Sequence, residues 1–328
     1  MKHSNISIFI PHLGCPFNCI FCDQFKITGS DSAVTPSDVY NTLSNALKSD
    51  TINKGNTQIA FFGGSFTAIP KSLMIEYLKV ANKFIGLGKF ESIRISTRPD
   101  CIDKETLEIL KKYNVKTIEL GIQSLDEDVL IASKRGHSVK TALESCRLII
   151  DGGFELGMQM MCGLPEDNYD KDIKTAKKII ELGCKQVRIY PVVVIEGTYL
   201  AKMYKESRYT PLNVEEAIEI CSDLYKLFTD NDVTVLKVGL HSDSDSIAGP
   251  FHPAFGELVR SEVFYKTLTN QINIKNAYTV YVSNSFISIA KGNCKRNELK
   301  LMNNNYNVTF KVDPKLQKDS YKIIKVSQ

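Results

Sequence analysis

Short apolar runs alternate with longer amphipathic segments through about the first 240 residues of the chain. Seven apolar runs are rich in β-branched and aromatic residues, as buried parallel strands are. They cover residues 6–10, 58–62, 92–96, 117–121, 156–161, 186–191 and 234–238. The segments between them read as helices with matching caps and stops, at 36–49, 71–85, 103–113, 125–133, 139–151, 170–182 and 213–231.

This alternation predicts a parallel sheet with helices outside it. Six or seven strand–helix units are compatible with a full barrel, a partial barrel or an open doubly wound sheet, and periodicity does not choose between them. In each of these folds, ligands bind at the carboxyl ends of the strands. We therefore expect polar and glycine-rich runs that follow strands to form one site.

The pattern changes after Val238. A polar, loop-like stretch at 239–249 precedes a predicted helix at 255–270, and alternating runs at 278–289, 306–312 and 321–326 suggest antiparallel strands. The sequence thus predicts one domain over 1–240 and a small α+β domain over 245–328.

Composition indicates the expected cellular compartment and shows that charge is distributed unevenly along the chain. A 43% hydrophobic and 24% charged content is ordinary for a soluble protein. No apolar run approaches the roughly 18 residues of a membrane span, so no membrane partner and a reducing cytoplasm are expected. From Phe251 onward, twelve Lys and Arg stand against five Asp and Glu, giving +7, whereas the preceding residues carry −3. Such a basic end indicates either a polyanionic partner or a solvated lysine-rich surface.

Three of the nine cysteines lie close together after the first predicted strand, at Cys15, Cys19 and Cys22. Three thiolates on one loop can hold three corners of an iron–sulfur cube and leave the fourth iron open to a ligand. Zinc is an alternative, with His12 as a possible fourth ligand, but zinc sites usually draw on two separated pairs. A disulfide framework fits poorly with an odd number of cysteines in a chain of 328 residues.

Further polar motifs follow the later strands in chain order. They are Gly63-Gly64-Ser65-Phe66-Thr67, Ser96-Thr97-Arg98-Pro99-Asp100, the run 119–123 ending in Gln123, Arg135-Gly136-His137, and Met161-Cys162-Gly163. Paired glycines let a backbone approach a ligand closely. Each motif alone is also typical of a turn or of strand-end packing, and His12 and His137 are more often structural than catalytic. The remaining cysteines form no second cluster motif, and only Cys162 is expected near the site.

These motifs together resemble the radical S-adenosylmethionine (SAM) enzymes. More narrowly, residues 5–240 are similar to the radical domain of the catalytic subunit of Elongator, a tRNA-modifying enzyme, through 62–70, 97–100, 119–124, 135–137 and Tyr190-Pro191. Several of these positions also resemble oxygen-independent coproporphyrinogen oxidases. The resemblance implies a partial (β/α)6 TIM-type barrel with a small C-terminal α+β domain.

The resemblance also implies cofactors and roles. Cys15, Cys19 and Cys22 would bind a 4Fe–4S cluster, whose fourth iron would hold SAM for reductive cleavage to a 5′-deoxyadenosyl radical. The cofactor-binding residues would be Phe21 near the adenine, Gly63 and Gly64 at the methionine amino group, and Ser65, Thr97, Gln123 and Arg135. An electron donor such as flavodoxin or ferredoxin and a substrate such as tRNA or another RNA would be partners.

The chain departs from both families at two positions. Ser96 stands where Elongator has a glutamate and where coproporphyrinogen oxidases also carry an acid, and the latter carry another acid near Gln159. Elongator's acetyltransferase domain is not expected, because only about ninety residues follow Val238. Besides RNA, the substrate could be a small anionic metabolite or a tetrapyrrole, and a non-catalytic iron–sulfur or haem-binding protein is a third hypothesis.

Overall fold

The computed structural model describes residues 4–10, 15, 17–23, 34–240 and 245–326. Its main feature is a seven-stranded sheet in the order β1-β2-β3-β4-β5-β6-β8, in which every neighbouring pair is parallel. The strands are β1 (Ser4–Ile10), β2 (Thr57–Gly63), β3 (Ser92–Thr97), β4 (Val115–Gln123), β5 (Glu155–Cys162), β6 (Gln186–Pro191) and β8 (Thr234–Val238). All seven predicted strands are confirmed, and the sheet is the predicted partial barrel.

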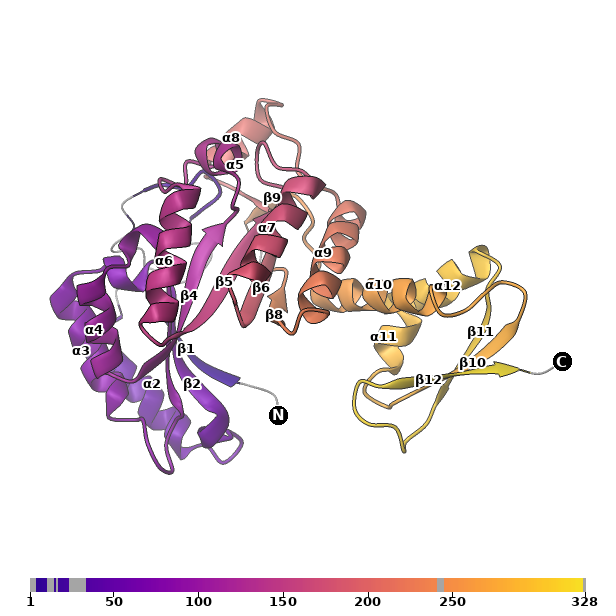
Figure 1. Cartoon of the computed structure of the whole chain (residues 1–328), viewed down its shortest axis with the longest axis horizontal. Coiled ribbons are helices and arrows are strands. Elements are labelled where there is room, and N and C mark those ends of the chain that lie inside the picture. The colour runs from indigo at the N-terminus through magenta and orange to yellow at the C-terminus, as the bar shows by residue number, and fades with distance from the viewer. Residues whose placement is uncertain (1–3, 11–14, 16, 24–33, 241–244, 327–328) are drawn as a thin grey trace.

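Helices cover the outer face of this sheet (Figure 1). They are α2 (Pro36–Lys48), α3 (Lys71–Asn82), α4 (Lys104–Lys112), α6 (Val139–Asp151), α7 (Tyr169–Glu181) and α9 (Val214–Thr229). The short helix α5 (Glu127–Ala132) lies instead at the carboxyl ends of the strands (Figure 1). Most begin at a polar N-cap, for example Asp103, whose carboxylate accepts from the Thr106 N–H at 2.7 Å. The apolar helix stripes and the outward strand residues form one large core, from Ile8 in β1 to Val238 in β8.

A smaller cluster of buried residues lies at the carboxyl ends of the strands. It joins Ile20 of the cysteine loop to Val129, Leu164 and Leu200. Two short strands, β7 (Val194–Ile195) and β9 (Ser246–Ala248), pair antiparallel beside helix α8 (Tyr199–Lys205). The sequence pattern did not predict these three elements, and it indicated a loop where β9 lies. The first part of that predicted loop, 241–244, lies outside the described residues.

The C-terminal part has a core of its own, around Val280, Leu301 and Phe310. Its elements are α10 (Phe255–Thr269), β10 (Ala277–Val282), α11 (Ile287–Lys291), α12 (Arg296–Asn303), β11 (Asn307–Val312) and β12 (Tyr321–Val326). Two expectations are wrong here. Residues 287–289 are helical rather than extended, and β10 pairs parallel with β11, because α11 and α12 carry the chain back across the sheet. The pairing of β10 with β12 is antiparallel, as expected.

Helix α10 connects the two parts (Figure 1). Phe255 and Val259 belong to the barrel core, whereas Phe264 and Leu268 belong to the C-terminal core. The predicted division between residues 240 and 245 stays a prediction. Among the described residues, none of the helices has both the length and the apolar character that crossing a bilayer requires.

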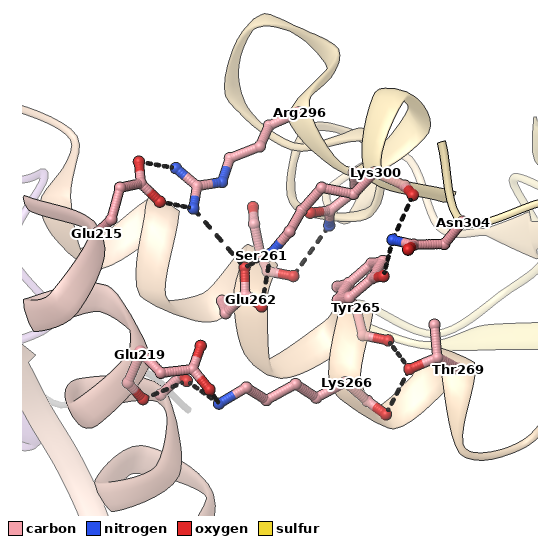
Figure 2. A network of polar contacts seen from close by, with 12 residues as sticks. Glu215, Glu219, Ser261, Glu262, Tyr265, Lys266, Thr269, Arg296, Lys300 and Asn304 are labelled. Atoms are coloured by element: carbon pink, nitrogen blue, oxygen red, sulfur yellow. Dashed lines mark hydrogen bonds and ion pairs between the residues drawn. The ribbon is translucent and has the colours of Figure 1, made fainter. Parts of the chain in front are cut away.

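Ion pairs reinforce this connection (Figure 2). The Arg296 guanidinium of α12 binds both carboxylate oxygens of Glu215 in α9. The Lys266 ammonium of α10 donates to Asp223 at 2.7 Å and pairs with Glu219 at 2.6 Å. Lys300 contacts the buried Glu262 at 2.7 Å. Lys266 and Arg296 of the basic end are therefore paired with acids of α9, which leaves the C-terminal surface less positive than the residue count suggests.

Candidate cofactor site

The cysteine loop follows β1 and is held by its own hydrophobic anchor. Ile20 is 1% exposed, and its N–H donates to the Ser133 carbonyl at 3.2 Å while its carbonyl accepts from the Leu200 N–H at 2.8 Å. A turn closed by the Cys22 N–H on the Cys19 carbonyl brings those two residues together. Anchoring Ile20 therefore fixes the positions of the flanking cysteines. Residues 11–14 and 16, including His12, lie outside the described residues.

All three cysteines line one cavity at the carboxyl end of the sheet. Strands β2 to β5 supply the facing wall, since their strand-end motifs converge as parallel topology requires. The full lining is Cys15, Phe17, Asn18, Cys19, Phe21, Cys22, Gly64, Ser65, Ser96, Thr97, Arg98, Gly121, Gln123, Arg135 and Gln159. The structure thus brings together every predicted site residue except Gly63.

Gly63 lies immediately behind this wall. Its φ of +102° is in the region that favours glycine, and a Cβ there would come within 2.5 Å of the Ile10 carbonyl oxygen. The next residue, Gly64, donates its N–H to that same carbonyl at 3.0 Å. Gly63 therefore allows β1 and β2 to close tightly, which positions Gly64 and Ser65 at the cavity.

Two arginines surround the buried thiol of Cys19. Arg135 Nη1 lies 3.2 Å and Arg98 Nη1 lies 3.7 Å from Cys19 Sγ. Arg98 is only 2% exposed and is oriented by Asp100, whose Oδ1 accepts from its Nε at 2.9 Å. On the neighbouring cysteine, the Ser65 hydroxyl lies 3.3 Å from Cys15 Sγ. The site therefore surrounds its thiols with donors, and two of these donors are cationic.

The sequence did not predict Arg98 as a site residue. Arg98 stands in the motif Thr97-Arg98-Pro99-Asp100, but nothing in a strand-end motif tells which side chain turns into the cavity. Phe17, Asn18 and Gly121 were not predicted either. Phe17 covers Arg98, with its ring centroid 5.1 Å from the guanidinium carbon, and it packs on Gly136, where a Cβ would lie 2.4 Å from the ring.

Ser96 and Gln159, the neutral residues at the positions where the chain departs from the similar families, also line the cavity. Ser96 Oγ is buried and makes no hydrogen bond among the described residues. Gln159 Nε2 donates to Glu119 Oε1 at 2.5 Å. Glu119 is the register partner of Ser96 on the neighbouring strand and is 1% exposed. The Glu119 carboxylate therefore lies next to the cavity. It is on β4 rather than at position 96 on β3, and it accepts hydrogen bonds from protein donors.

His137 and Cys162 do not line the cavity. Burial, together with the cations of Arg135 and Arg98, lowers the pKa of His137 to about 4, so its imidazole is neutral at neutral pH. Neither ring nitrogen has a hydrogen-bond partner in the described part of the chain. Cys162 was expected near the site, but it faces the helices, where its Sγ lies 3.6 Å from Cys221 Sγ in the main core.

The donor set fits an iron–sulfur cube with one open iron. Within the described ranges, no group of three or more His, Cys, Asp or Glu side chains converges as the ligands of one metal ion. In a cube each thiolate binds a different iron, and the three cysteines that line this cavity are the number that leaves the fourth iron open. The cationic donors at Cys19 would offset the negative charge that three thiolates bring.

The sequence matches two known family profiles. The profile of the Radical SAM superfamily matches residues 9–179, and that of the Radical_SAM C-terminal domain matches residues 184–264. A tRNA uridine(34) acetyltransferase of Methanocaldococcus infernus is 39% identical over 132 residues, which are 39% of this chain and 24% of that protein. An uncharacterised protein of Methanocaldococcus jannaschii is 30% identical over 227 residues, covering 64% of this chain and 68% of its own length.

The fold has a counterpart among solved structures. The archaeal Elp3 of Methanocaldococcus infernus, solved without its N-terminal residues, superposes with a TM-score of 0.64 at 22% identity, over 82% of this chain and 64% of that one. Because the match to the tRNA uridine(34) acetyltransferase spans about a quarter of that enzyme, it covers only part of what that enzyme contains.

Proposed function

This chain belongs to the radical SAM superfamily, and from that premise we propose that it is an enzyme that binds a 4Fe–4S cluster and SAM and acts on RNA, with tRNA as the leading candidate. The observation that carries the proposal is the single cavity lined by Cys15, Cys19 and Cys22. When bound, the cluster supplies the electron that cleaves SAM to methionine and a 5′-deoxyadenosyl radical, which takes hydrogen from the substrate.

The residues around the thiols would tune and orient the cofactors. Hydrogen bonds to cluster sulfurs and nearby charge set the reduction potential of such centres. The cations of Arg98 and Arg135 near Cys19 would favour the reduced, more negative form. Arg135 is also fixed by a hydrogen bond to the Gly121 carbonyl, which aims its planar fork into the cavity. Such a fork suits the carboxylate of SAM.

Other predicted SAM residues form the rest of the wall. Thr97 Oγ1 lies 2.6 Å from Thr67 Oγ1, so its side chain is held in one orientation. Gln123 has a left-handed φ of 66°, next to the register shift between β4 and β5, and this conformation turns the end of β4 into the cavity. Phe21 provides an apolar surface beside the cysteines, which suits an adenine ring.

The central experiment compares Cys19→Ala with Cys294→Ala, an exposed cysteine outside the cavity. After anaerobic reconstitution and reduction, the wild type and the Cys294 variant should bind iron and form 5′-deoxyadenosine from SAM. The Cys19 variant should stay folded by circular dichroism but lose both properties. SAM cleavage by the Cys19 variant would overturn the proposal, and no cleavage by the wild type would favour a non-catalytic iron–sulfur or haem-binding protein.

The open face of the C-terminal sheet supports an RNA substrate. Tyr278, Val280 and Val282 of β10 point into the C-terminal core, so the alternate residues face outward. Tyr281 lies on this outward face between its register partners Lys311 and Lys322, both of which are exposed. Neither lysine has an ion-pair partner in the part of the chain that the structure describes. An aromatic ring between two free ammonium groups suits an unpaired base and its phosphates.

Filter binding of tRNA at several salt concentrations tests this substrate class. Reversing both charges, with Lys311→Glu and Lys322→Glu, should weaken binding and lower the salt slope by roughly 0.7–0.9 for each phosphate that the variant no longer neutralises. The control is Lys174→Glu with Lys177→Glu, two exposed lysines on α7. A wild type without salt-sensitive affinity for tRNA would instead favour a small anionic metabolite or a tetrapyrrole, tested by substrate-dependent formation of 5′-deoxyadenosine.

A further inference from the structure

The interior face of the sheet carries a row of buried charges next to the cofactor cavity. Arg94 of β3, Glu119 of β4 and Arg188 of β6 are linked, since Glu119 accepts from Arg188 Nε at 2.8 Å and pairs with Arg94 at 4.0 Å. Gln159 connects this row to the cavity, because it lines the cavity and donates to Glu119. This row of charges is therefore directly adjacent to the cofactor cavity, with Gln159 between them.

Lys237 of β8 extends the row by one more cation. It is the register partner of Arg188, so its side chain is on the same face of the sheet. Its Nζ is buried and has no hydrogen-bond partner among the described residues. Burial and the neighbouring Arg188 cation lower the pKa of Lys237 to about 8, which still leaves it mostly protonated at pH 7.

Among the residues that the structure describes, the charges on this face do not balance. Three cations, Arg94, Arg188 and Lys237, share one buried carboxylate, that of Glu119. The next acid along β5, Glu155, is partly exposed and pairs with Lys116. A buried ammonium without a partner is costly, because it loses its hydration and gains nothing in return. Phe62, whose ring centroid lies 5.0 Å from the Arg188 guanidinium carbon, supplies an apolar wall beside these cations.

We propose that Lys237 and Arg188 form an anion-binding subsite that receives a carboxylate or phosphate group of the substrate inside the barrel. This inference rests on the proposed function for its place in the reaction, because the subsite lies beyond Gln159 from the cofactor cavity. An anion there would reduce the excess of positive charge and give Lys237 its missing acceptor. Glu119 and Tyr190 position Arg188 from the other side. The subsite thereby selects substrates that carry an anionic group near the reacting carbon.

Thermal unfolding of the full-length chain tests the subsite without turnover. Acetate and inorganic phosphate should each raise the melting temperature of the wild type, whereas acetamide and sodium chloride at equal ionic strength should not. Lys237→Met should shift the anion-dependent rise to higher anion concentration, with a fitted affinity roughly ten- to a hundredfold weaker, the worth of one charged hydrogen bond. Lys185→Met, at the exposed opposite end of the same strand pair, should behave as the wild type does.

The variant itself distinguishes a binding site from a structural lysine. Without anion, Lys237→Met should melt at a higher temperature than the wild type, because it removes an unpaired buried charge. Equal anion-dependent shifts in both proteins, or no shift in the wild type, would overturn the subsite. A larger effect of acetate identifies a carboxylate ligand and a larger effect of phosphate a phosphate ligand.

SAM cleavage separates this inference from the function on which it rests. Wild-type protein that cleaves SAM but ignores both anions refutes the subsite alone. Protein that responds to anions through Lys237 but does not cleave SAM refutes the proposed function and leaves the subsite standing.

Discussion

Arg188 and Lys237 are register partners on neighbouring strands, yet only Arg188 has a carboxylate partner among the described residues. Their pairing depends on a shift of one residue in the register. Thr234 and Val235 stand opposite Gln186 and Val187, and the shift then brings Lys237 rather than Leu236 opposite Arg188. A one-residue shift moves a side chain to the other face of a sheet. The irregularity is therefore what adds the unpaired ammonium to the interior.

The pKa of Lys237 predicts how anion binding depends on pH. Binding of acetate, which stays a monoanion from pH 6 to 10, should be strongest below about pH 8 and should weaken above it, as Lys237 loses its proton. Arg94 and Arg188 keep their charge, and Tyr190 stays neutral because burial raises its pKa to about 12. Titration calorimetry from pH 6 to 10 measures this dependence, and affinity that is constant over that range would contradict it.

The same lysine predicts a change in stability without anion. Its pKa is lower in the folded than in the unfolded chain, so the unfolded state binds more protons between about pH 8 and 10.5. The free energy of unfolding of the wild type should therefore rise, relative to that of Lys237→Met, as pH increases through this window. Denaturant titrations of both proteins at matched pH values provide the comparison.

His137 predicts sensitivity to acid. Its pKa of about 4 in the folded protein lies below the ordinary value of 6.5, so the unfolded state binds the proton first as pH falls. Stability from this residue is present above pH 6.5 and is lost between pH 6.5 and 4, to a limit of about 3 kcal/mol. His137→Leu should remove this loss.

The measurement is the free energy of unfolding in urea from pH 7 to 4 for both proteins. Asp167 titrates in the same window, since burial raises its pKa to about 6, but it does so in both proteins. The difference between the two curves therefore isolates His137. Parallel curves would show that its imidazole finds a partner that keeps it protonated.

Substitution of Gly63 should disturb the structure locally, and substitution of Gly55 provides the control. Gly63→Ala places a methyl group within 2.5 Å of the Ile10 carbonyl oxygen at a φ of +102°, so β1 and β2 must separate. We expect a loss of roughly 1–3 kcal/mol in stability and weaker SAM binding through displacement of Gly64 and Ser65. Gly55→Ala, which meets nothing within 4 Å, should change neither. Equal SAM affinity in the two variants would contradict this role.

Much of the barrel was predictable from the sequence, because the apolar periodicity and the turn or cap residues indicate the same element bounds there. Gln186–Pro191, Thr234–Val238 and Val139–Asp151 have the predicted bounds, since each apolar run is bounded by turn or cap residues. The C-terminal part was less predictable. The alternating run that begins at Tyr278 continues into the helix at Ile287, and no local signal distinguishes parallel from antiparallel pairing of Ala277–Val282.

Some residues of the candidate site were likewise predictable from the sequence and others were not. Cys15, Cys19, Cys22 and the strand-end motifs could be identified because their spacing along the chain is itself the signal. Arg98 and Lys237 could not, because their importance depends on which way a side chain turns. Glu119 stands in one of the strand-end motifs, but its role as the partner of two arginines appears only when three strands are placed side by side.

Helix α10 has a mechanical consequence for the proposed RNA substrate. Its 15 residues span about 22 Å, and its two ends belong to two different cores. Lys266, near its C-terminal end, is tied by ion pairs to α9. A hinge motion between the barrel and the C-terminal sheet would have to disrupt the packing of this helix in the two cores and its ion pairs with α9. If the proposed RNA substrate binds the outward lysines of the C-terminal sheet, this helix would hold that binding surface at a set distance from the cavity. Only nucleotides at that distance from the bound segment would then reach the cavity.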